Sequence, residues 1–145
     1  MPYLIDFDYE VSRFYGIQIL KSIIMKTVIL AGGYGTRLAE YTDKIPKPMV
    51  QIGDKPILSH IMNFYQSFGY DEFIIAAGYK KNVISEYYKD SKEFKNVKII
   101  DTGKDTMTGG RILRLRSYFE KDENFFMTYG DGLCSINLKR LIQFH

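Results

Sequence analysis

Short apolar runs alternate along this chain with longer stretches in which apolar residues recur every three or four positions. The runs at 27–31, 72–77, 97–100 and 125–129 are predicted to be strands. A continuous apolar run bounded by turn residues is typical of a strand that is covered on both faces of a parallel sheet. We therefore expect a buried parallel sheet.

Helical periodicity fills the intervals between these strands. Pro56 can open a helix whose apolar stripe runs from Ile57 to Phe68, and Gly69 is placed to end it. Further helices are predicted at 83–90, 113–119 and 138–142. Strands that alternate with helices predict an α/β fold, with an open, mostly parallel Rossmann-like sheet and helices on both faces.

The first 24 residues differ from the rest, since they are first aromatic and acidic and then weakly helical. We expect residues 1–24 to be an appended segment, and residues 25–145 to be the nucleotide-binding part of a larger domain. The last helical pattern reaches position 145 with no following strand, so a truncated domain is expected.

Composition narrows the possible ligands. Apolar residues make up 46% of the chain, and the net charge of +3 comes from 20 basic and 17 acidic residues that are scattered along it. The sequence contains no block of basic residues of the kind that would indicate nucleic-acid binding. It also contains no run that approaches the roughly 20 apolar residues of a membrane span. Cys134 is the single cysteine and His60 has no nearby histidine, so the sequence lacks the residues for a disulfide or zinc framework. We expect a small anionic ligand and a reducing, cytoplasmic location.

A glycine-rich loop follows the first predicted strand. Gly32, Gly33 and Gly35 allow the backbone to approach phosphate oxygens, and their amide groups can form an anion-binding concavity. Thr36 and Arg37 add a hydroxyl and a cationic fork. The pattern predicts a site for a nucleotide triphosphate, and a tight structural turn is the alternative.

Two better-known phosphate loops do not match. A dinucleotide fingerprint that starts at Gly33 and Gly35 needs glycine where Leu38 stands. A Walker A loop needs a lysine after its second glycine, and none occurs between Lys26 and Lys44.

Two charged residues stand where they could serve such a site. Lys47, between Pro46 and Pro48, has a backbone that we expect to be held away from helix, and it can direct a cation toward the glycine loop. Asp131 follows the fourth predicted strand and stands between two glycines, where its carboxylate can approach a Mg²⁺ ion closely. A solvated lysine and an ordinary Asp-Gly turn are the alternatives.

A polar helix entrance precedes the fourth strand. Thr106 and Thr108 stand before Gly109, Gly110 and Arg111, an arrangement that offers amide groups and a guanidinium to an anion or to a base edge. For Thr108 helix capping is the simpler interpretation, whereas we expect a ligand contact from Arg111.

Together these segments resemble the sugar nucleotidyltransferases, in particular the cytidylyltransferases that act on glucose 1-phosphate. The motifs that carry the resemblance are 30–38, Lys47-Pro48-Met49, Gly53 with 55–58, 101–103, 107–111 and 128–132. The resemblance implies transfer of CMP from CTP to glucose 1-phosphate with release of pyrophosphate, and Mg²⁺ as cofactor. A homo-oligomer is possible in the intact protein.

The resemblance also assigns roles by position. Asp131 matches a magnesium ligand, and the nucleotide contacts are Leu30, Ala31, Gly32, Gly33, Tyr34, Gly35, Thr36, Arg37, Lys47, Thr106, Arg111 and Gly130. We expect Arg37, Lys47 and Asp131 to carry the chemistry. Use of UTP or dTTP, or an inactive nucleotide-binding fragment, are the alternatives.

Overall fold

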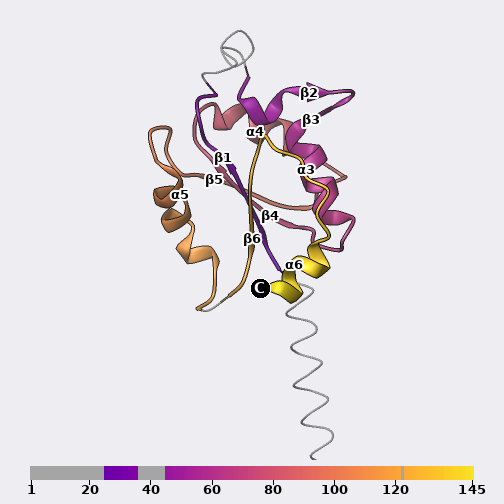
Figure 1. Ribbon diagram of the computed structural model, residues 1–145. Helices are drawn as coiled ribbons and strands as arrows, with labels where there is room; N and C mark the ends of the chain where they lie inside the picture. The colour runs from indigo at the N-terminus through magenta and orange to yellow at the C-terminus, as the bar shows by residue number, and fades with distance from the viewer. Residues whose placement is uncertain (1–24, 36–44, 122) are drawn as a thin grey trace, which may run out of the picture.

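The computed structural model describes residues 25–35, 45–121 and 123–145, and it confirms an α/β fold with a parallel sheet. The predicted segment 1–24, together with Thr36 and Arg37, lies outside the described residues. The main sheet has the order β5-β4-β1-β6 (Figure 1). Its strands are β1 (Thr27–Ala31), β4 (Glu72–Ala77), β5 (Asn96–Asp101) and β6 (Phe126–Tyr129).

The apolar runs form the strands because the sheet is covered on both faces. Every residue of β1 is buried, and so are five of the six residues of β4. Leu30 of β1 lies beside Ala76 on one side and Tyr129 on the other. All pairings in this sheet are parallel, so the carboxyl ends of β1, β4 and β6 meet at one edge.

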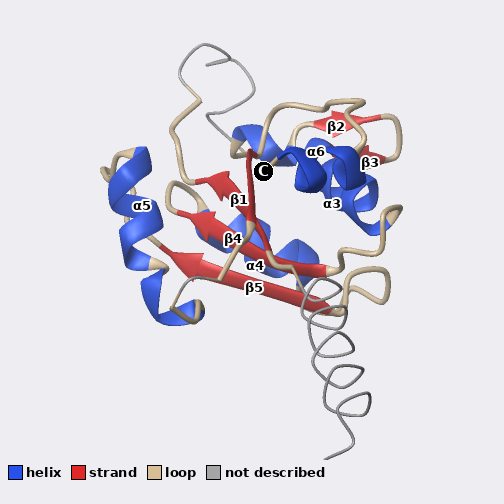
Figure 2. Ribbon diagram, turned by 60° about the horizontal axis from the view of Figure 1, so that its bottom comes forward, coloured by secondary structure: helices blue, strands red, loops and turns tan. Residues whose placement is uncertain are grey.

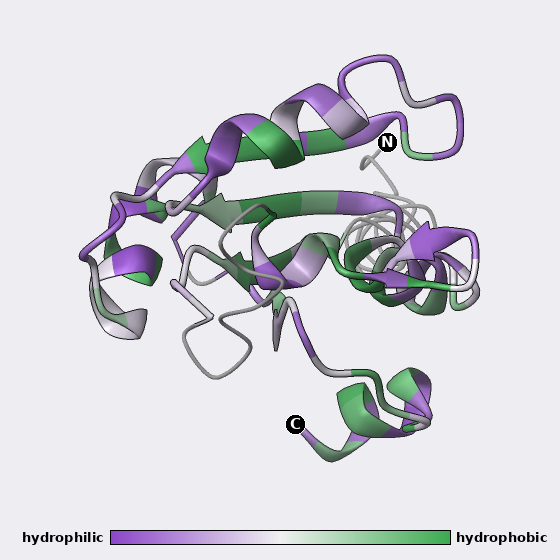
Figure 3. Ribbon diagram, turned by 90° about the horizontal axis from the view of Figure 1, so that it is seen from above, coloured by the Kyte–Doolittle hydropathy of each residue, from purple (hydrophilic) through white to green (hydrophobic). Residues whose placement is uncertain are grey.

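Helices lie on both faces of the sheet (Figure 2). Helices α3 (Ile57–Gln66), α4 (Lys81–Tyr88) and α6 (Leu138–Phe144) pack on the face that carries Ile29 and Ile75. Helix α5 (Thr108–Arg114) and the 3-10 turn η3 (Arg116–Tyr118) cover the face of Val28 and Ile74. Figure 3 shows hydrophobic residues running through the strands between these layers.

The predicted stop of α3 is confirmed. Gly69 has a φ of 90°, the left-handed conformation that favours glycine, and the Tyr70 amide donates to the Tyr65 carbonyl at 3.1 Å. Such a bond closes a Schellman motif and pairs a carbonyl that the end of the helix would leave free. The chain can then turn directly into β4.

The structure corrects three local expectations. Lys47–Met49 form a 3-10 turn, η2, because proline is tolerated in a first helical turn that needs no amide donor. A small hairpin of β2 (Gln51–Ile52) and β3 (Lys55–Pro56) follows and was not predicted.

Helix α5 is the third correction, since it runs from Thr108 to Arg114 and not from 113 to 119. Thr108 is therefore the first helical residue, and Met107 occupies the capping position with no side-chain cap. The glycines at 109 and 110 lie inside the helix. Gly110 is packed against the preceding loop, because a Cβ there would lie 2.9 Å from the Thr106 side chain.

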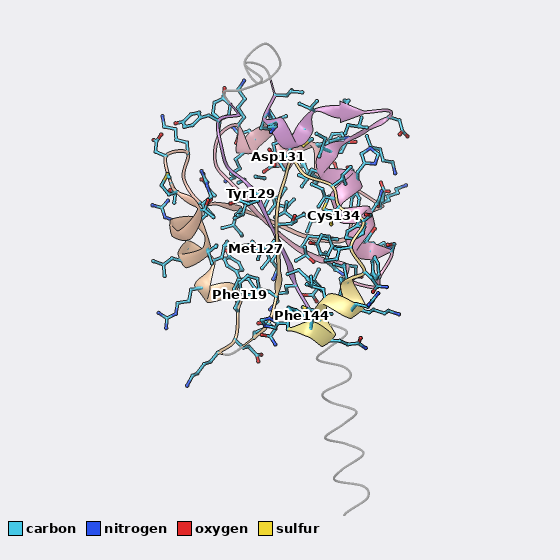
Figure 4. The ribbon with its side chains drawn as sticks, in the orientation of Figure 1. Phe119, Met127, Tyr129, Asp131, Cys134 and Phe144 are labelled. Atoms are coloured by element: carbon cyan, nitrogen blue, oxygen red, sulfur yellow. The ribbon has the colours of Figure 1, made fainter. Side chains whose placement is uncertain are left out.

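Strand β6 is an outer strand of the described sheet, and two of its side chains are uncovered. Met127 and Tyr129, labelled in Figure 4, are 48% and 58% exposed. They are paired with Val28 and Leu30, so they lie on the face of the sheet that α5 covers elsewhere. Among the described residues, no helix has the length and apolar content that crossing a membrane would need.

Candidate functional site

A cleft of about 280 Å³ opens at the carboxyl edge of the sheet, where parallel α/β sheets usually bind their ligands. It brings together the loop after β1, the turn η2, the start of α5 and the end of β6. Its lining residues are Leu30, Ala31, Gly32, Gly33, Gly35, Lys47, Pro48, Thr106, Met107, Thr108, Arg111, Tyr129, Gly130 and Asp131. The glycine loop and Asp131 thus share one cleft, as the sequence predicts.

The glycines of the loop after β1 serve different purposes. A Cβ on Gly32 would lie 2.0 Å from a guanidinium nitrogen of Arg111, so packing within the protein excludes a side chain there. At Gly33 a Cβ would meet nothing within 4 Å, which leaves the backbone bare toward the cleft. Gly33 is therefore a position at which a phosphate can approach the amide backbone closely.

Arg111 lies beneath this loop and is only 5% exposed. Its guanidinium donates to the Gly32 carbonyl at 2.8 Å, to the Gly103 carbonyl at 2.7 Å and to the Thr102 hydroxyl at 2.7 Å. Longer contacts reach the carbonyls of Lys104 at 3.2 Å and Ala77 at 3.4 Å. Arg111 therefore ties together the segments that follow β1, β4 and β5.

No described salt bridge includes Arg111, so backbone dipoles and a hydroxyl satisfy its charge. Burial lowers the pKa of Arg111, with the nearby Arg114 acting in the same direction. A guanidinium nevertheless stays protonated in a protein. The floor of the cleft therefore carries a positive charge that an anionic ligand would balance.

Lys47 and Asp131 both line the cleft and contact each other. The Lys47 ammonium forms an ion pair with an Asp131 carboxylate oxygen, and both side chains remain partly exposed. Figure 4 shows Asp131 at the end of β6, beyond Tyr129. The pair brings a cation and a carboxylate to the same cleft as Gly33.

Gly130 holds η2 and β6 close together. Its amide donates to the Leu30 carbonyl at 3.0 Å, and a Cβ there would lie 3.0 Å from the Pro48 ring. A larger residue would push η2 away from β6. The close approach explains how neighbouring Lys47 and Asp131 come within reach of each other.

The protein groups of the cleft can hold a magnesium ion only together with a bound ligand that supplies further oxygen atoms. Among the described residues, no three histidine, cysteine or acidic side chains are grouped to hold a metal. Mg²⁺ commonly binds one or two carboxylates while phosphates and water complete its octahedron. Asp131, partly exposed at the cleft, can supply such a single carboxylate.

The remaining predicted positions divide into three groups. Leu30, Ala31 and Thr106 line the cleft as expected. Tyr34 instead directs its hydroxyl to Asp105 and is not among the lining residues. Thr36 and Arg37 lie outside the described residues.

The sequence motifs assign no role to two residues near the cleft, Asp105 and Tyr79. Tyr79 lies just beyond the carboxyl end of β4, and its amide donates to the Gly32 carbonyl at 3.2 Å. The rule that placed Asp131 at the end of β6 could also have flagged Tyr79. No local pattern distinguishes Asp105 from the other polar residues of its loop.

Comparison with known proteins agrees with this geometry. Residues 26–145 match the nucleotidyl transferase family model. A probable glucose-1-phosphate cytidylyltransferase of Bacillus subtilis is 45% identical over 142 aligned residues, and a glucose-1-phosphate cytidylyltransferase of Salmonella typhimurium is 46% identical over 143. Each alignment covers 83% of this chain and 56% of the relative, so the chain spans little more than half the length of these proteins.

A solved structure shares the fold. HddC from Yersinia pseudotuberculosis, in complex with GMP-PN, superposes with a TM-score of 0.71 at 34% identity, over 83% of this chain and 53% of that one. The family model covers the whole sheet, the cleft and every segment that lines it. The chain therefore belongs to the nucleotidyl transferase family.

Proposed function

We propose that this chain is the nucleotide-binding part of a glucose-1-phosphate cytidylyltransferase, which transfers CMP from CTP to glucose 1-phosphate. The observation that carries the proposal is that the glycine loop and Asp131 line one cleft. Identity of 45–46% to glucose-1-phosphate cytidylyltransferases supports the choice of nucleotide and sugar. A cytoplasmic location and a homo-oligomer stay predictions.

In this reaction an oxygen of the sugar phosphate attacks the α-phosphorus of CTP. A new P–O bond forms there, and the bond from the α-phosphorus to the bridging oxygen breaks, so pyrophosphate leaves with the electron pair. No covalent intermediate on the protein is needed. The protein contributes by aligning the two phosphates and by stabilising the negative charge that shifts to the leaving group.

The residues of the cleft suit that task. The bare backbone at Gly33 can donate to phosphate oxygens, and Arg111 places a positive charge beneath the same loop. Lys47 can exchange its ion pair with Asp131 for a contact with a phosphate. Arg37 would add a third cation, as the sequence predicts.

Asp131 would hold Mg²⁺ together with the phosphates of the nucleotide. When bound, the ion supplies positive charge that lowers the repulsion between the attacking phosphate and the triphosphate. Asp131 also draws Lys47 toward the cleft in the free protein. Both roles require its carboxylate to be ionised.

Turnover tests the proposal directly. The protein is incubated with CTP, glucose 1-phosphate and Mg²⁺, and CDP-glucose and pyrophosphate are measured; parallel reactions contain UTP or dTTP, because contacts to phosphates do not distinguish bases. We expect CDP-glucose to form fastest. Binding of CTP without product would identify an inactive nucleotide-binding fragment, and faster reaction with UTP or dTTP would overturn the choice of CTP.

Asp131→Asn tests the role of the carboxylate. Loss of a group that stabilises the transition state typically costs about 10²–10³-fold in rate, and we expect a fall in kcat of that order. Asp90→Asn is the matched control, because Asp90 is exposed beyond the end of α4 and away from the cleft. Similar kcat values for the two variants would remove Asp131 from the mechanism.

A further inference from the structure

Tyr34 belongs to the glycine loop, yet its side chain turns away from the cleft that the loop lines. Gly33 and Gly35 on either side of it are lining residues, whereas Tyr34 is not. Its hydroxyl donates a hydrogen bond to the Asp105 carboxylate. Its ring packs against that of Tyr79, with centroids 5.0 Å apart and planes inclined by 43°.

Asp105 belongs to the loop between β5 and α5 and is not itself a lining residue of the cleft. It precedes Thr106, which lines the cleft together with the start of α5. The hydrogen bond from Tyr34 therefore joins two segments that are distant in the chain but face the same cleft. It bridges the glycine loop and the loop that leads into α5.

A second connection joins the same segments at greater depth. Arg111, 5% exposed, donates to Gly32 in the glycine loop and to Gly103 in the loop between β5 and α5. Tyr34 is 40% exposed, so its bond to Asp105 lies nearer to the surface. Two connections at different depths hold the loops more firmly against rotation than one buried connection can.

We propose that Tyr34 and Asp105 are a positioning pair that fixes the separation of these two loops, so that the glycine-loop amides are held ready for the phosphates of a nucleotide. The inference rests on the proposed function for the identity of the ligand. The bridge itself depends only on the contacts of the free protein. Loops that are ordered before binding lose less conformational entropy when the ligand arrives, and affinity rises accordingly.

The chemistry of the pair suits this role. The hydrogen bond to Asp105 raises the pKa of Tyr34 above its ordinary value, so the hydroxyl keeps the proton that it donates throughout the neutral range. The bond also directs an acidic side chain toward Tyr34. The Asp105 carboxylate therefore accepts the hydrogen bond from Tyr34 and is not left without a partner beside an anion site.

Three variants separate the bridge from general effects on folding. Tyr34→Phe removes the hydroxyl and keeps the ring that packs on Tyr79. Asp105→Ala removes the acceptor, and Asp105→Asn retains an acceptor oxygen without the charge. Tyr87→Phe is the control, because Tyr87 is 46% exposed on α4 and remote from the cleft.

Hydrogen exchange in the free protein tests whether the bridge exists. The net strength of a side-chain hydrogen bond corresponds to about a 3–10-fold change in a local equilibrium. We expect amides of residues 33–35 and 103–106 to exchange faster by that factor in Tyr34→Phe and Asp105→Ala, and at the original rate in Asp105→Asn and Tyr87→Phe. Unchanged exchange in both loops of Tyr34→Phe would overturn the proposal.

Calorimetric titration with CTP in the presence of Mg²⁺ tests the positioning role. We expect Tyr34→Phe to raise the Kd about 3–10-fold in the original background and to have no further effect in Asp105→Ala. Faster exchange with no change in CTP affinity would overturn the positioning role and leave a structural contact. If the original protein binds no CTP, the proposed function fails and the positioning role fails with it, while the exchange data still decide the bridge.

Discussion

Replacing Arg111 by methionine should destabilise the whole carboxyl edge of the sheet. The guanidinium makes three short hydrogen bonds, to the carbonyls of Gly32 and Gly103 and to the Thr102 hydroxyl, and it is almost completely buried. Methionine can fill much of the space of the aliphatic stem but offers no donor. Arg111→Met therefore isolates the hydrogen bonds from most of the packing.

The expected loss follows from the number of acceptors left behind. Each buried acceptor that loses its donor costs about 1–3 kcal/mol. The Gly32 carbonyl still accepts from the Tyr79 amide, and the Thr102 hydroxyl still donates to Ala77, so the lower end applies. Removing a buried charge also recovers part of its desolvation cost, which leaves a net loss of about 2–3 kcal/mol.

Thermal unfolding measures this loss. For a domain of this size about 2–3 kcal/mol corresponds to a fall in Tm of roughly 6–10 °C. Arg116→Met is the matched control, because Arg116 is exposed on η3, and its Tm should change by less than about 2 °C. An equal, small shift in both variants would show that the guanidinium does not hold these loops together.

Two further predictions concern tyrosine ionisation and the crowding of the glycines. Burial raises the pKa of Tyr88, whose hydroxyl is hydrogen-bonded to Ser59, whereas the unfolded chain releases this proton near pH 10. The stability that Tyr88 contributes is therefore complete below that pH and is lost progressively as the pH rises from there toward the raised pKa of the folded state, by up to about 1.4 kcal/mol per pH unit. Urea unfolding should show a shallower loss between pH 9 and 11 in Tyr88→Phe; equal slopes would contradict the assignment. A Cβ on Gly78 would lie 2.6 Å from the Gly103 carbonyl, so Gly78→Ala should cost about 1–3 kcal/mol, whereas Gly109→Ala, in open space on α5, should stabilise by about 0.5–1 kcal/mol. Thermal unfolding that ranked these two variants in the opposite order would refute the packing around Gly78.

The sequence predicts the sheet well because burial on both faces leaves a direct signal. In β1 and β4 nearly every side chain is enclosed, so the apolar runs mark the strands almost to the residue. The same topology brings the ends of β1 and β6 side by side, so the order of strands and loops in the sequence predicts that Gly33 and Asp131 line one cleft. The apolar stripe and the glycine stop of α3 are local signals of the same kind.

The errors occur where distant contacts override local preference. Gly109 and Gly110 suggest a loop, yet they lie in α5, where Gly110 allows the Thr106 side chain to pack closely. Arg111 lines the cleft, and its contact with a ligand stays a prediction. Its acceptors in the free protein are the Thr102 hydroxyl and backbone carbonyls of three separate segments, and no spacing along the chain encodes them.

Tyr34 illustrates the same limit in the site itself. The resemblance implies a nucleotide contact for Tyr34, which stays a prediction, whereas the partner of its hydroxyl, Asp105, lies in a loop that the sequence marks only as polar. Such a pairing depends on the parallel register that brings the loop after β1 close to the loop after β5. The sequence thus indicates the chemistry of the cleft better than the contacts that shape it.

In the proposed function, one cleft holds a nucleotide through the glycine loop and its metal ion through Asp131. Calorimetric titration with CTP, with Mg²⁺ and with excess EDTA, tests it most directly in the original protein and in Asp131→Asn. We predict saturable binding of one CTP per chain that Mg²⁺ strengthens, and loss of that strengthening in the variant. CTP affinity that is the same with and without Mg²⁺ in both proteins, or no binding at all, would contradict the account.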